Sequence, residues 1–441
     1  MKIPVRGAWL TGSGMAASAL GTLGATAVMV AVSSAGVYSD VAIVTLVVLL
    51  TSMVAQLGAD RVAVAEVHGA GAGAHSGRQR GAELLGLVSL NGVVAAALLI
   101  SPIGLPLLET PLTSPLSLVE KLAVAAWVCS DTIRLVAAEL HRANYRFGWA
   151  LVSGMGVRAP LFLGAISVLG VVKHDVDRTS LLVAAAIASA VVLLVSMSRA
   201  SLDFPWWVAR PLRALKRLWR GHLSMVLTTC AAALIGGADV WIIGATAEGA
   251  VAAPYALAVT VVSGLTIATT AITGGVLPYL AQAVSKGELS EITPRLVPFV
   301  RIACLLVVVG YVVIVSLSRP AAILLGGEAY TDITIFVAVL GAGQIVNVAA
   351  GIAGAVLIAT RRYTALMRAT TSVSLLVVVG EAVSGFVFDS PLMVCAVSAT
   401  GTGLLSVVCA ATVRRVSGIR TDAFARVTRL PSVDDEQPLY T

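Results

Sequence analysis

Charged side chains interrupt several long apolar stretches of this sequence. Arginine guanidinium groups hold phosphate oxygens through paired hydrogen bonds and stay charged when partly desolvated. A charge at bilayer depth costs roughly 3 kcal/mol on insertion scales, so such side chains usually face a cavity or a partner. With nearby aromatic and amide groups they predict an anion-binding site, whose candidate residues are Asp60, Arg61, Trp127, Asp131, Arg134, Arg158, Arg301, Gln344 and Asn347.

Helical spacing places several polar residues on common faces. Residues three, four or seven apart lie on one side of a helix. The sequence has such stripes on four predicted helices, and together they predict a wet chamber inside a helical bundle. They are Thr11, Ser18, Thr22 and Thr26; Thr45, Ser52, Gln56 and Asp60; Glu120, Trp127, Asp131 and Arg134; and Gln344 with Asn347.

Three arginines fall at a similar predicted depth. Arg61, Arg134 and Arg158 each lie some five to nine residues from a predicted cytoplasmic helix end, which corresponds to roughly 7–14 Å at a rise of 1.5 Å per residue. They would form one cluster facing the chamber. The alternative is structural: Arg134 pairs with Asp131 on its own helix, Arg61 extends to the membrane surface, and Arg158 forms an ion pair with Glu139 or Asp60.

Other polar residues within the spans also have two interpretations. Asp239 could hold an ion, bind a ligand, or serve a structural role by hydrogen bonding to the break that precedes Tyr255. Tyr255 is expected at interface depth, at the start of the next helix. Glu381 is expected at the interface, while Gln344 and Asn347 could form hydrogen bonds between helices.

The composition defines the elements that must position these residues. The chain has 441 residues, of which 58% are hydrophobic and 12% charged, and its mean hydropathy is +0.94. A water-soluble fold could not bury this many apolar residues, so the bilayer must solvate much of the protein surface. Windows of about 20 apolar residues predict an all-α integral membrane protein. Its twelve transmembrane helices are expected at residues 8–32, 41–66, 81–104, 118–140, 149–171, 180–197, 221–245, 253–277, 296–317, 331–358, 369–388 and 391–413.

The distribution of Lys and Arg predicts the topology. These residues concentrate on alternate loops, which places both termini in the cytoplasm. The first residues resemble a signal peptide, but cleavage there would break this alternation. The net charge of +7 is therefore mainly a topology signal and does not indicate nucleic-acid binding.

Two halves follow from the spacing of the spans. Six spans, a long basic connection and six more spans suggest two six-helix lobes around a central cavity. The expected divisions are an N-terminal lobe at 1–197, a basic amphipathic cytoplasmic linker at 198–220, a C-terminal lobe at 221–413 and a disordered cytoplasmic tail at 414–441. Tryptophans and leucines interleaved with cations in the linker suggest a helix at the membrane surface.

No enzyme motif is present. The sequence lacks a Walker-type loop, a histidine pair at metal-ligand spacing and a nucleophile elbow. Its five cysteines fall within predicted spans, where they behave as small apolar residues. We expect no catalysis, no metal and no cofactor. Transport would then be secondary, or driven by the substrate's own gradient.

The segment 237–288 resembles the seventh and eighth helices of polysaccharide transporters, the oligosaccharide-lipid flippases of the multidrug/oligosaccharidyl-lipid/polysaccharide exporter superfamily. The stretch 36–67 is similar to that family's first-to-second helix region. The matching residues in the longer segment are Asp239, Gly244, Gly249, Tyr255, Ala256 and Pro278.

The resemblance implies a two-lobed transporter that flips a polyprenyl-pyrophosphate-linked oligosaccharide from the inner to the outer leaflet of a bacterial plasma membrane. Glycosyltransferases or a polymerase of the same pathway would be its partners. One alternative is a drug or cation antiporter of the same superfamily. Those proteins depend on an acidic residue in the first helix, and Ala8 to Val32 contains none. The other alternative is a transport-dead scaffold for cell-wall assembly that recruits a partner through its tail.

Overall fold

The computed structural model is entirely helical within the residues that it describes. These are residues 5–68, 74–144, 146–154, 156–173, 175–206, 210–221, 223–247, 249–266, 280, 283–284 and 289–425.

The N-terminal lobe is a bundle of long helices, several of which are broken. Its helices pack on one another around the central α6, which contacts α2, α3, α4, α7 and α9. They are α1 (Val5–Val32), α2 (Ala35–Ala55), α3 (Ala59–His68), α4 (Ala74–Leu99), α5 (Leu105–Glu109), α6 (Leu118–Ala143), α7 (Phe147–Ser153), α8 (Arg158–Lys173) and α9 (Arg178–Asp203).

The C-terminal lobe contains similar breaks. The helices α16, α18 and α19 pack together, with α15 and α13 against α16 and α11 against α18. The elements are α11 (Leu223–Ile235), α12 (Ala238–Thr246), α13 (Gly249–Ser263), η2 (Gly264–Thr266), α15 (Leu289–Gly326), η3 (Gly327–Tyr330), α16 (Ile333–Ala349), α17 (Ala353–Ala359), α18 (Tyr363–Ala382), the π-helical η4 (Val383–Val387) and α19 (Pro391–Ser417).

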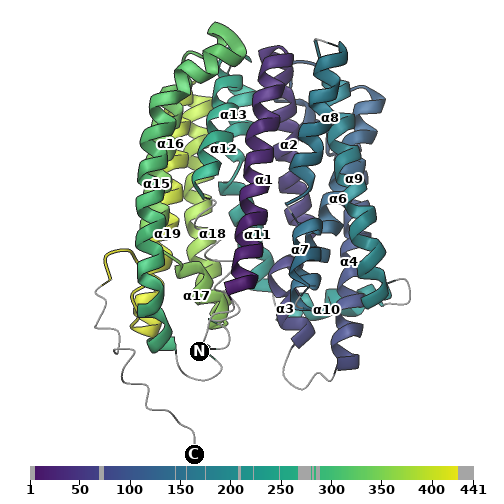
Figure 1. Cartoon of the computed structure of the whole chain (residues 1–441), viewed down its shortest axis with the longest axis vertical. Coiled ribbons are helices and arrows are strands. Elements are labelled where there is room, and N and C mark those ends of the chain that lie inside the picture. The colour runs from purple at the N-terminus through teal and green to yellow at the C-terminus, as the bar shows by residue number, and fades with distance from the viewer. Residues whose placement is uncertain are drawn as a thin grey trace, which may run out of the picture.

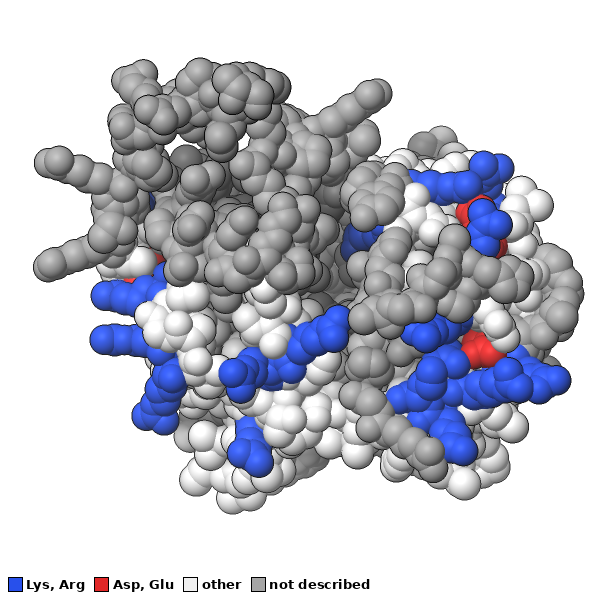
Figure 2. Space-filling model, turned by 90° about the horizontal axis from the view of Figure 1, so that it is seen from below, with Lys and Arg blue, Asp and Glu red and all other residues white. Residues whose placement is uncertain are grey.

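Figure 1 shows the two lobes side by side, with α1 between them. The start of α1 and the end of α19 lie at the same end of the bundle, which we call the basic end. Figure 2 looks onto this end and shows many exposed Lys and Arg side chains over both lobes. Their position agrees with the charge pattern of the predicted cytoplasmic loops.

Each of the twelve predicted spans contains at least one described helix. Within the described residues, six helices are long and apolar enough to cross a membrane, or up to eight if each of two bent pairs forms one span. Described helices such as α7, α13 and α17 are too short to cross a membrane alone, so the total of twelve spans stays a prediction. The apolar surface of α15 suits lipid contact, since Leu305, Leu306 and Val312 are each more than half exposed.

The break between α2 and α3 has a clear local cause. Leu57 and Gly58 both have positive φ, at 51° and 70°. A Cβ at Gly58 would lie 3.2 Å from the backbone of Met225, at the start of α11 in the other lobe. Glycine therefore permits both the turn and the close approach of the two backbones.

The linker contains a helix that belongs to the N-terminal lobe. Helix α10 (Pro211–Gly221) packs on α4, with Ala214 and Leu218 buried. Arg217 Nη1 donates to Glu83 Oε2 at 2.6 Å. Trp219 is 63% exposed, which leaves an apolar group free for the membrane surface.

Two helices in the structure extend beyond the domain boundaries that the sequence predicts. Helix α9 continues to Asp203, past the predicted lobe boundary at 197. Helix α19 continues to Ser417, and residues up to Ala425 pack on the protein instead of beginning a disordered tail at 414. Residues 426–441 of the predicted tail lie outside the described part of the chain.

Candidate functional site

A cavity of about 320 Å³ lies between the two lobes. Its walls come from α1, α2, α6 and α8 on one side and from α12 and α13 on the other. The polar and aromatic residues that line it are Thr22, Thr26, Tyr38, Thr45, Trp127, Arg158, Phe162, Thr260 and Ser263. Three of the threonines, Thr22, Thr26 and Thr45, belong to the predicted stripes of the first two spans, so part of each stripe lines this cavity.

Asp131 is the centre of the charged cluster beside this cavity. Its carboxylate accepts hydrogen bonds from Arg134 Nε at 2.7 Å and from Trp127 Nε1 at 3.2 Å. Arg158 Nε lies 3.8 Å away. The spacing of Trp127, Asp131 and Arg134 on one face of α6 makes this arrangement possible, as the sequence predicts.

Arg158 is the arginine that reaches the cavity. It begins α8, and its guanidinium carbon lies 4.7 Å from the centre of the Trp127 ring. Its Nε donates to Ser189 Oγ at 2.7 Å. Among the described residues, its two Nη groups have no hydrogen-bond partner. A fixed guanidinium with free donors can bind a phosphate or carboxylate.

Arg134 is enclosed within the lobe. Besides Asp131, it donates from Nη1 to the carbonyl oxygens of Ser153 and Gly154, where α7 ends. Its side chain is 3% exposed. These contacts fit the alternative structural role of Arg134. Because the side chain of Arg61 lies outside the described part, the cluster of three arginines stays a prediction.

Two further predicted site residues, Asp60 and Arg301, do not line the cavity. Asp60 is half-buried in the first turn of α3; the side chain of its neighbour Arg61 lies outside the described part. Arg301 donates to the carbonyl oxygens of Ala423 and Ala425 at 2.9 and 2.7 Å.

The two amides of span ten bond to each other, and one of them, Asn347, also bonds to a neighbouring helix. Asn347 Nδ2 donates to Gln344 Oε1 at 2.9 Å, and Asn347 Oδ1 accepts from Ser406 Oγ of α19 at 2.6 Å. Neither amide lines the interlobe cavity. The hydrogen bond between Asn347 and Ser406 fits the interhelical alternative.

A second polar cluster lies inside the C-terminal lobe. Asp239 accepts from Tyr255 Oη at 2.5 Å, from Ser398 Oγ at 2.8 Å and from the backbone N–H of Val240 at 2.8 Å. Tyr255 is fully buried and packs edge-on against Phe336, so its ring contacts protein; its depth in the membrane stays a prediction.

Glu381 is also buried inside the protein, and its expected interfacial depth stays a prediction. Its side chain is 0% exposed, and neither carboxylate oxygen has a hydrogen-bond partner among the described residues. It lies on α18, which packs on the helix that carries Asp239, and the two carboxylates interact electrostatically. Pro278, the last residue of the matched family motif, lies outside the described part.

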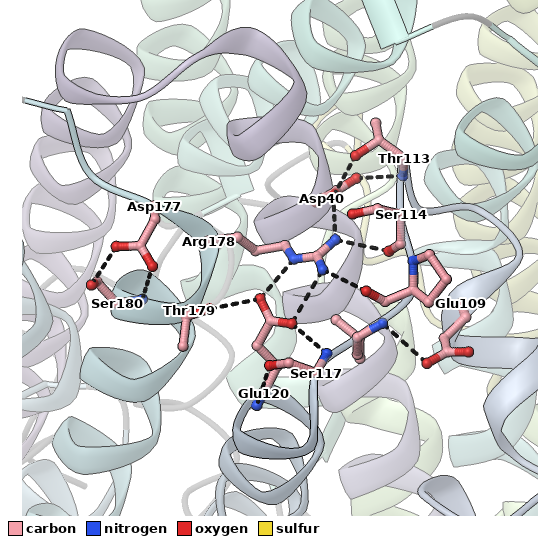
Figure 3. Close-up of polar contacts among 12 residues, drawn as sticks. Asp40, Glu109, Thr113, Ser114, Ser117, Glu120, Asp177, Arg178, Thr179 and Ser180 are labelled. Carbon is pink, nitrogen blue, oxygen red and sulfur yellow. Dashed lines mark hydrogen bonds and ion pairs between the residues drawn. The ribbon is translucent and has the colours of Figure 1, made fainter.

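Sequence reasoning missed a network at the end of the bundle opposite the basic end. Figure 3 shows Arg178 between two carboxylates: it donates to Asp40 at 2.7 Å and to Glu120 at 2.9 Å. Asp40 also accepts from the backbone and hydroxyl of Thr113. Arg178 lies between the fifth and sixth predicted spans, on the side of the predicted topology that has few Lys and Arg, and its isolation there was the available signal.

Asp177 caps the helix that carries Arg178. Its carboxylate accepts from Ser180 Oγ at 2.6 Å, and this hydrogen bond is the main reason that the pKa of Asp177 is lowered. Asp177 is the N-cap residue of α9, where a carboxylate also satisfies a free backbone N–H. The charged cap therefore fixes the first turn of the helix and positions Arg178.

Neither a family model nor a curated protein matches the sequence. Solved structures do share its fold. An inward-facing multidrug resistance MATE family transporter of the MOP superfamily aligns with a TM-score of 0.66 and 12% identity, over 91% of this chain and 95% of that one. The lipid II flippase MurJ, in an inward closed conformation, aligns with a TM-score of 0.63 and 12% identity over 90% and 86%.

A third structure gives a similar result. The MATE multidrug transporter DinF-BH in complex with R6G aligns with a TM-score of 0.63 and 15% identity, over 95% of this chain and 96% of that one. The chain thus shares the helical fold of these three structures. That fold is common to drug transporters and a lipid flippase.

Proposed function

We propose that this protein is a secondary transporter that flips a polyprenyl-pyrophosphate-linked oligosaccharide, or a related cell-envelope glycolipid, by alternating access. The basic end faces the cytoplasm of a bacterium, and the substrate moves from the inner to the outer leaflet of the plasma membrane. Glycosyltransferases or a polymerase of the same pathway would supply the substrate or use it.

The observation that carries this proposal is Arg158 in the cavity wall. Its Nε is held by Ser189, and its Nη groups remain available for a ligand. A single guanidinium held in a largely apolar cavity attracts an anionic headgroup, because low polarity strengthens charge-assisted hydrogen bonds. A pyrophosphate supplies the matching oxygens.

The other lining residues suit a sugar attached to that anion. Trp127 and Phe162 offer aromatic faces for the apolar sides of a sugar ring. Thr22, Thr45 and Thr260 come from both lobes and offer hydroxyl groups. The cavity is small enough to hold only the headgroup and the first sugar, so the lipid tail would remain in the bilayer.

The two-lobed architecture supports alternating access. Both lobes contribute to the cavity, so a rocking motion of one lobe against the other would change which side it faces. Asp239 is our candidate for ion coupling. A buried carboxylate is costly unless a proton, cation or hydrogen bonds neutralise it, and the nearby Glu381 adds a second such group.

The test of the proposal is transport by purified protein in liposomes. The probe is a polyprenyl-pyrophosphate disaccharide with a fluorophore on the sugar, whose arrival in the other leaflet is measured by chemical quenching. We expect Arg158→Ala to lower the rate by roughly 10–100-fold, because a charge-assisted hydrogen bond contributes about 1.5–3 kcal/mol. Arg158→Lys should retain part of the activity, and Arg213→Ala, on the exposed surface of α10, should retain all of it.

Arg134→Ala provides a structural comparison. This change removes one partner of the buried Asp131 carboxylate. It also leaves the carbonyl oxygens of Ser153 and Gly154 without their hydrogen bonds from Arg134. Breaking a buried pair costs about 3–5 kcal/mol, so the melting temperature should fall clearly. Arg158→Ala should change it less, because Asp131 keeps its nearer partner. Equal thermal losses would mean that Arg158 is structural too.

A drug or cation antiporter is the second candidate, favoured by the fold shared with multidrug transporters. The cationic dye R6G distinguishes the two functions. Removing the positive charge of Arg158 should not slow transport of a cation, whereas it should slow transport of a pyrophosphate lipid. Wild-type protein that moves neither probe would support the scaffold alternative.

A further inference from the structure

A groove on the C-terminal lobe, separate from the interlobe cavity, combines an apolar wall with a basic edge. It has a volume of about 900 Å³ and lies between α16 and α19 at the basic end. Val346 and Val407 belong to its apolar part, and Arg414, Arg415 and Arg420 belong to its edge. It shares no lining residue with the interlobe cavity.

One wall of the groove is a folded segment after α19, Gly418–Ala425, which we call the C-terminal strap. Gly418 has a φ of 70°, and its N–H bonds back to the carbonyl of Arg414, so the chain reverses there. The strap is then fixed at its other end: Ala423 N–H donates to Ala349 O at 2.9 Å. This is also the segment that Arg301 holds through two carbonyl oxygens.

The break between α16 and α17 makes room for the strap. The two helices meet at a bend of 46°. Gly351, in the break, has a φ of 81°, and a Cβ there would lie 2.0 Å from the carbonyl oxygen of Thr421. The strap therefore packs into the break between α16 and α17, where Thr421 is buried.

The charges at the edge do not cancel. Arg420 forms two hydrogen bonds with Asp422, at 2.9 and 3.1 Å. Burial alone would raise the pKa of Asp422, but the hydrogen bonds from Arg420 outweigh it and the pKa is lowered. Asp422 thus neutralises the charge of Arg420. Within the described residues, the exposed Arg414 and Arg415 form no ion pair.

The apolar part and the charged edge of the groove follow the same order as the acyl chains and headgroup of a phospholipid. Val407 and Arg414 are seven residues apart on α19, which is about 10 Å along the helix axis. The apolar part therefore lies deeper in the membrane, and the arginines lie at its surface. Phe424 of the strap, 74% exposed beside the arginines, suits the interface between headgroups and acyl chains.

We propose that this groove binds an anionic phospholipid of the leaflet at the basic end. Its phosphate contacts Arg414, Arg415 and Arg420, and one acyl chain lies along Val346 and Val407. A free phosphate would leave the apolar wall uncovered, and a zwitterionic lipid would leave the net positive charge of the edge unbalanced. The site is independent of the proposed transport function.

The experiment is native mass spectrometry of the full-length protein in detergent, titrated with phosphatidylglycerol or with phosphatidylcholine. The triple variant Arg414→Gln, Arg415→Gln, Arg420→Gln should weaken phosphatidylglycerol binding by roughly 10–100-fold and phosphatidylcholine binding little. The matched control removes three cations from the linker helix region: Arg210→Gln, Arg213→Gln, Lys216→Gln. It should leave the high-affinity phosphatidylglycerol site intact.

Three outcomes would overturn the proposal. They are equal affinity of the wild type for both lipids, an equal loss in the two triple variants, and displacement of the lipid by millimolar inorganic phosphate. If the groove variant is unstable, Val407→Asp provides an independent test, because Val407 is 49% exposed and its replacement adds a charge only to the acyl wall. It should weaken phosphatidylglycerol binding, and unchanged binding would also contradict the proposal.

Discussion

At the residue scale, two arginines near one aspartate have different roles because of their surroundings. Arg134 is surrounded by backbone carbonyls at the end of α7, whereas Arg158 lies against Trp127 at the cavity wall. The i,i+3 spacing on α6 was enough to predict the pair of Asp131 with Arg134. Nothing in the local sequence around Arg158 indicates Ser189, thirty-one residues later, as its partner.

The buried carboxylates of the C-terminal lobe give a prediction at the same scale. We expect Asp239→Asn to abolish the dependence of transport on an imposed sodium or proton gradient while leaving slow exchange without a gradient. An amide keeps the size of the side chain and most of its hydrogen bonds but removes the charge that an ion would neutralise. Transport is measured in liposomes with and without each gradient.

Glu381→Gln should weaken the same dependence, because the charge near Asp239 is removed. Glu328→Gln is the control, since Glu328 is exposed in η3. A variant Asp239→Asn that still responds fully to a gradient, but melts at a lower temperature, would assign Asp239 the structural role.

At the element scale, the breaks in the helices position the functional groups. The turn at Leu57 and Gly58 brings α2 against the other lobe, and the break at Gly351 seats the C-terminal strap. The position of the linker helix α10 is likewise determined by the helix on which it packs. Its cations and tryptophans suggested a membrane-surface helix, and the structure adds a docking face on α4.

Leu218→Asp should detach the linker helix from α4. Leu218 is 2% exposed, and burying an unpaired carboxylate there costs more than the helix–helix contact supplies. We expect faster cleavage by trypsin at Arg213 and Lys216, measured by mass spectrometry of the fragments. Leu212→Asp is the matched control because Leu212 is 70% exposed. Equal cleavage of the two variants would show that α10 is not held by this face.

At the scale of the whole molecule, the lobes are in contact at the end opposite the basic end. Tyr38 of α2 and Tyr330 of η3 are both buried and meet edge to face, with ring centres 6.2 Å apart. Trp241 Nε1 donates to Leu107 O at 2.7 Å across the same junction. In the alternating-access mechanism proposed above, these contacts would separate when the cavity opens at this end.

Gly326→Val should shift the conformational equilibrium towards opening at this end. A Cβ at Gly326 would lie 2.4 Å from the Tyr330 ring and 2.6 Å from Val30 of α1. The strain is relieved when the lobes move apart, so the closed state loses population. Spin labels at Thr110→Cys and Glu328→Cys, in a background without the five native cysteines, should report longer distances by double electron–electron resonance.

Gly164→Val is the control for this prediction. A Cβ at Gly164 meets nothing within 4 Å, so the added side chain should not disturb the lobes. Distance distributions that are identical for Gly326→Val and the parent would mean that Tyr330 adjusts within its own lobe and that this junction does not control opening.

The sequence by itself determined the all-helical membrane class and the approximate position of the long apolar helices. These properties depend on local composition, because apolar length and the placement of cations are set by consecutive residues. The same local rules predicted the stripes that bring Thr22, Thr45 and Trp127 to the cavity.

Only the tertiary structure decided which charged residues share a site. It brought Arg158 to Trp127 and Ser189, and Arg178 to Asp40 and Glu120, each from different helices. It also placed Arg301 on the C-terminal strap instead of in the cavity. The physical reason is that helix rotation and packing set the direction of a side chain, and both depend on contacts between residues far apart in the chain.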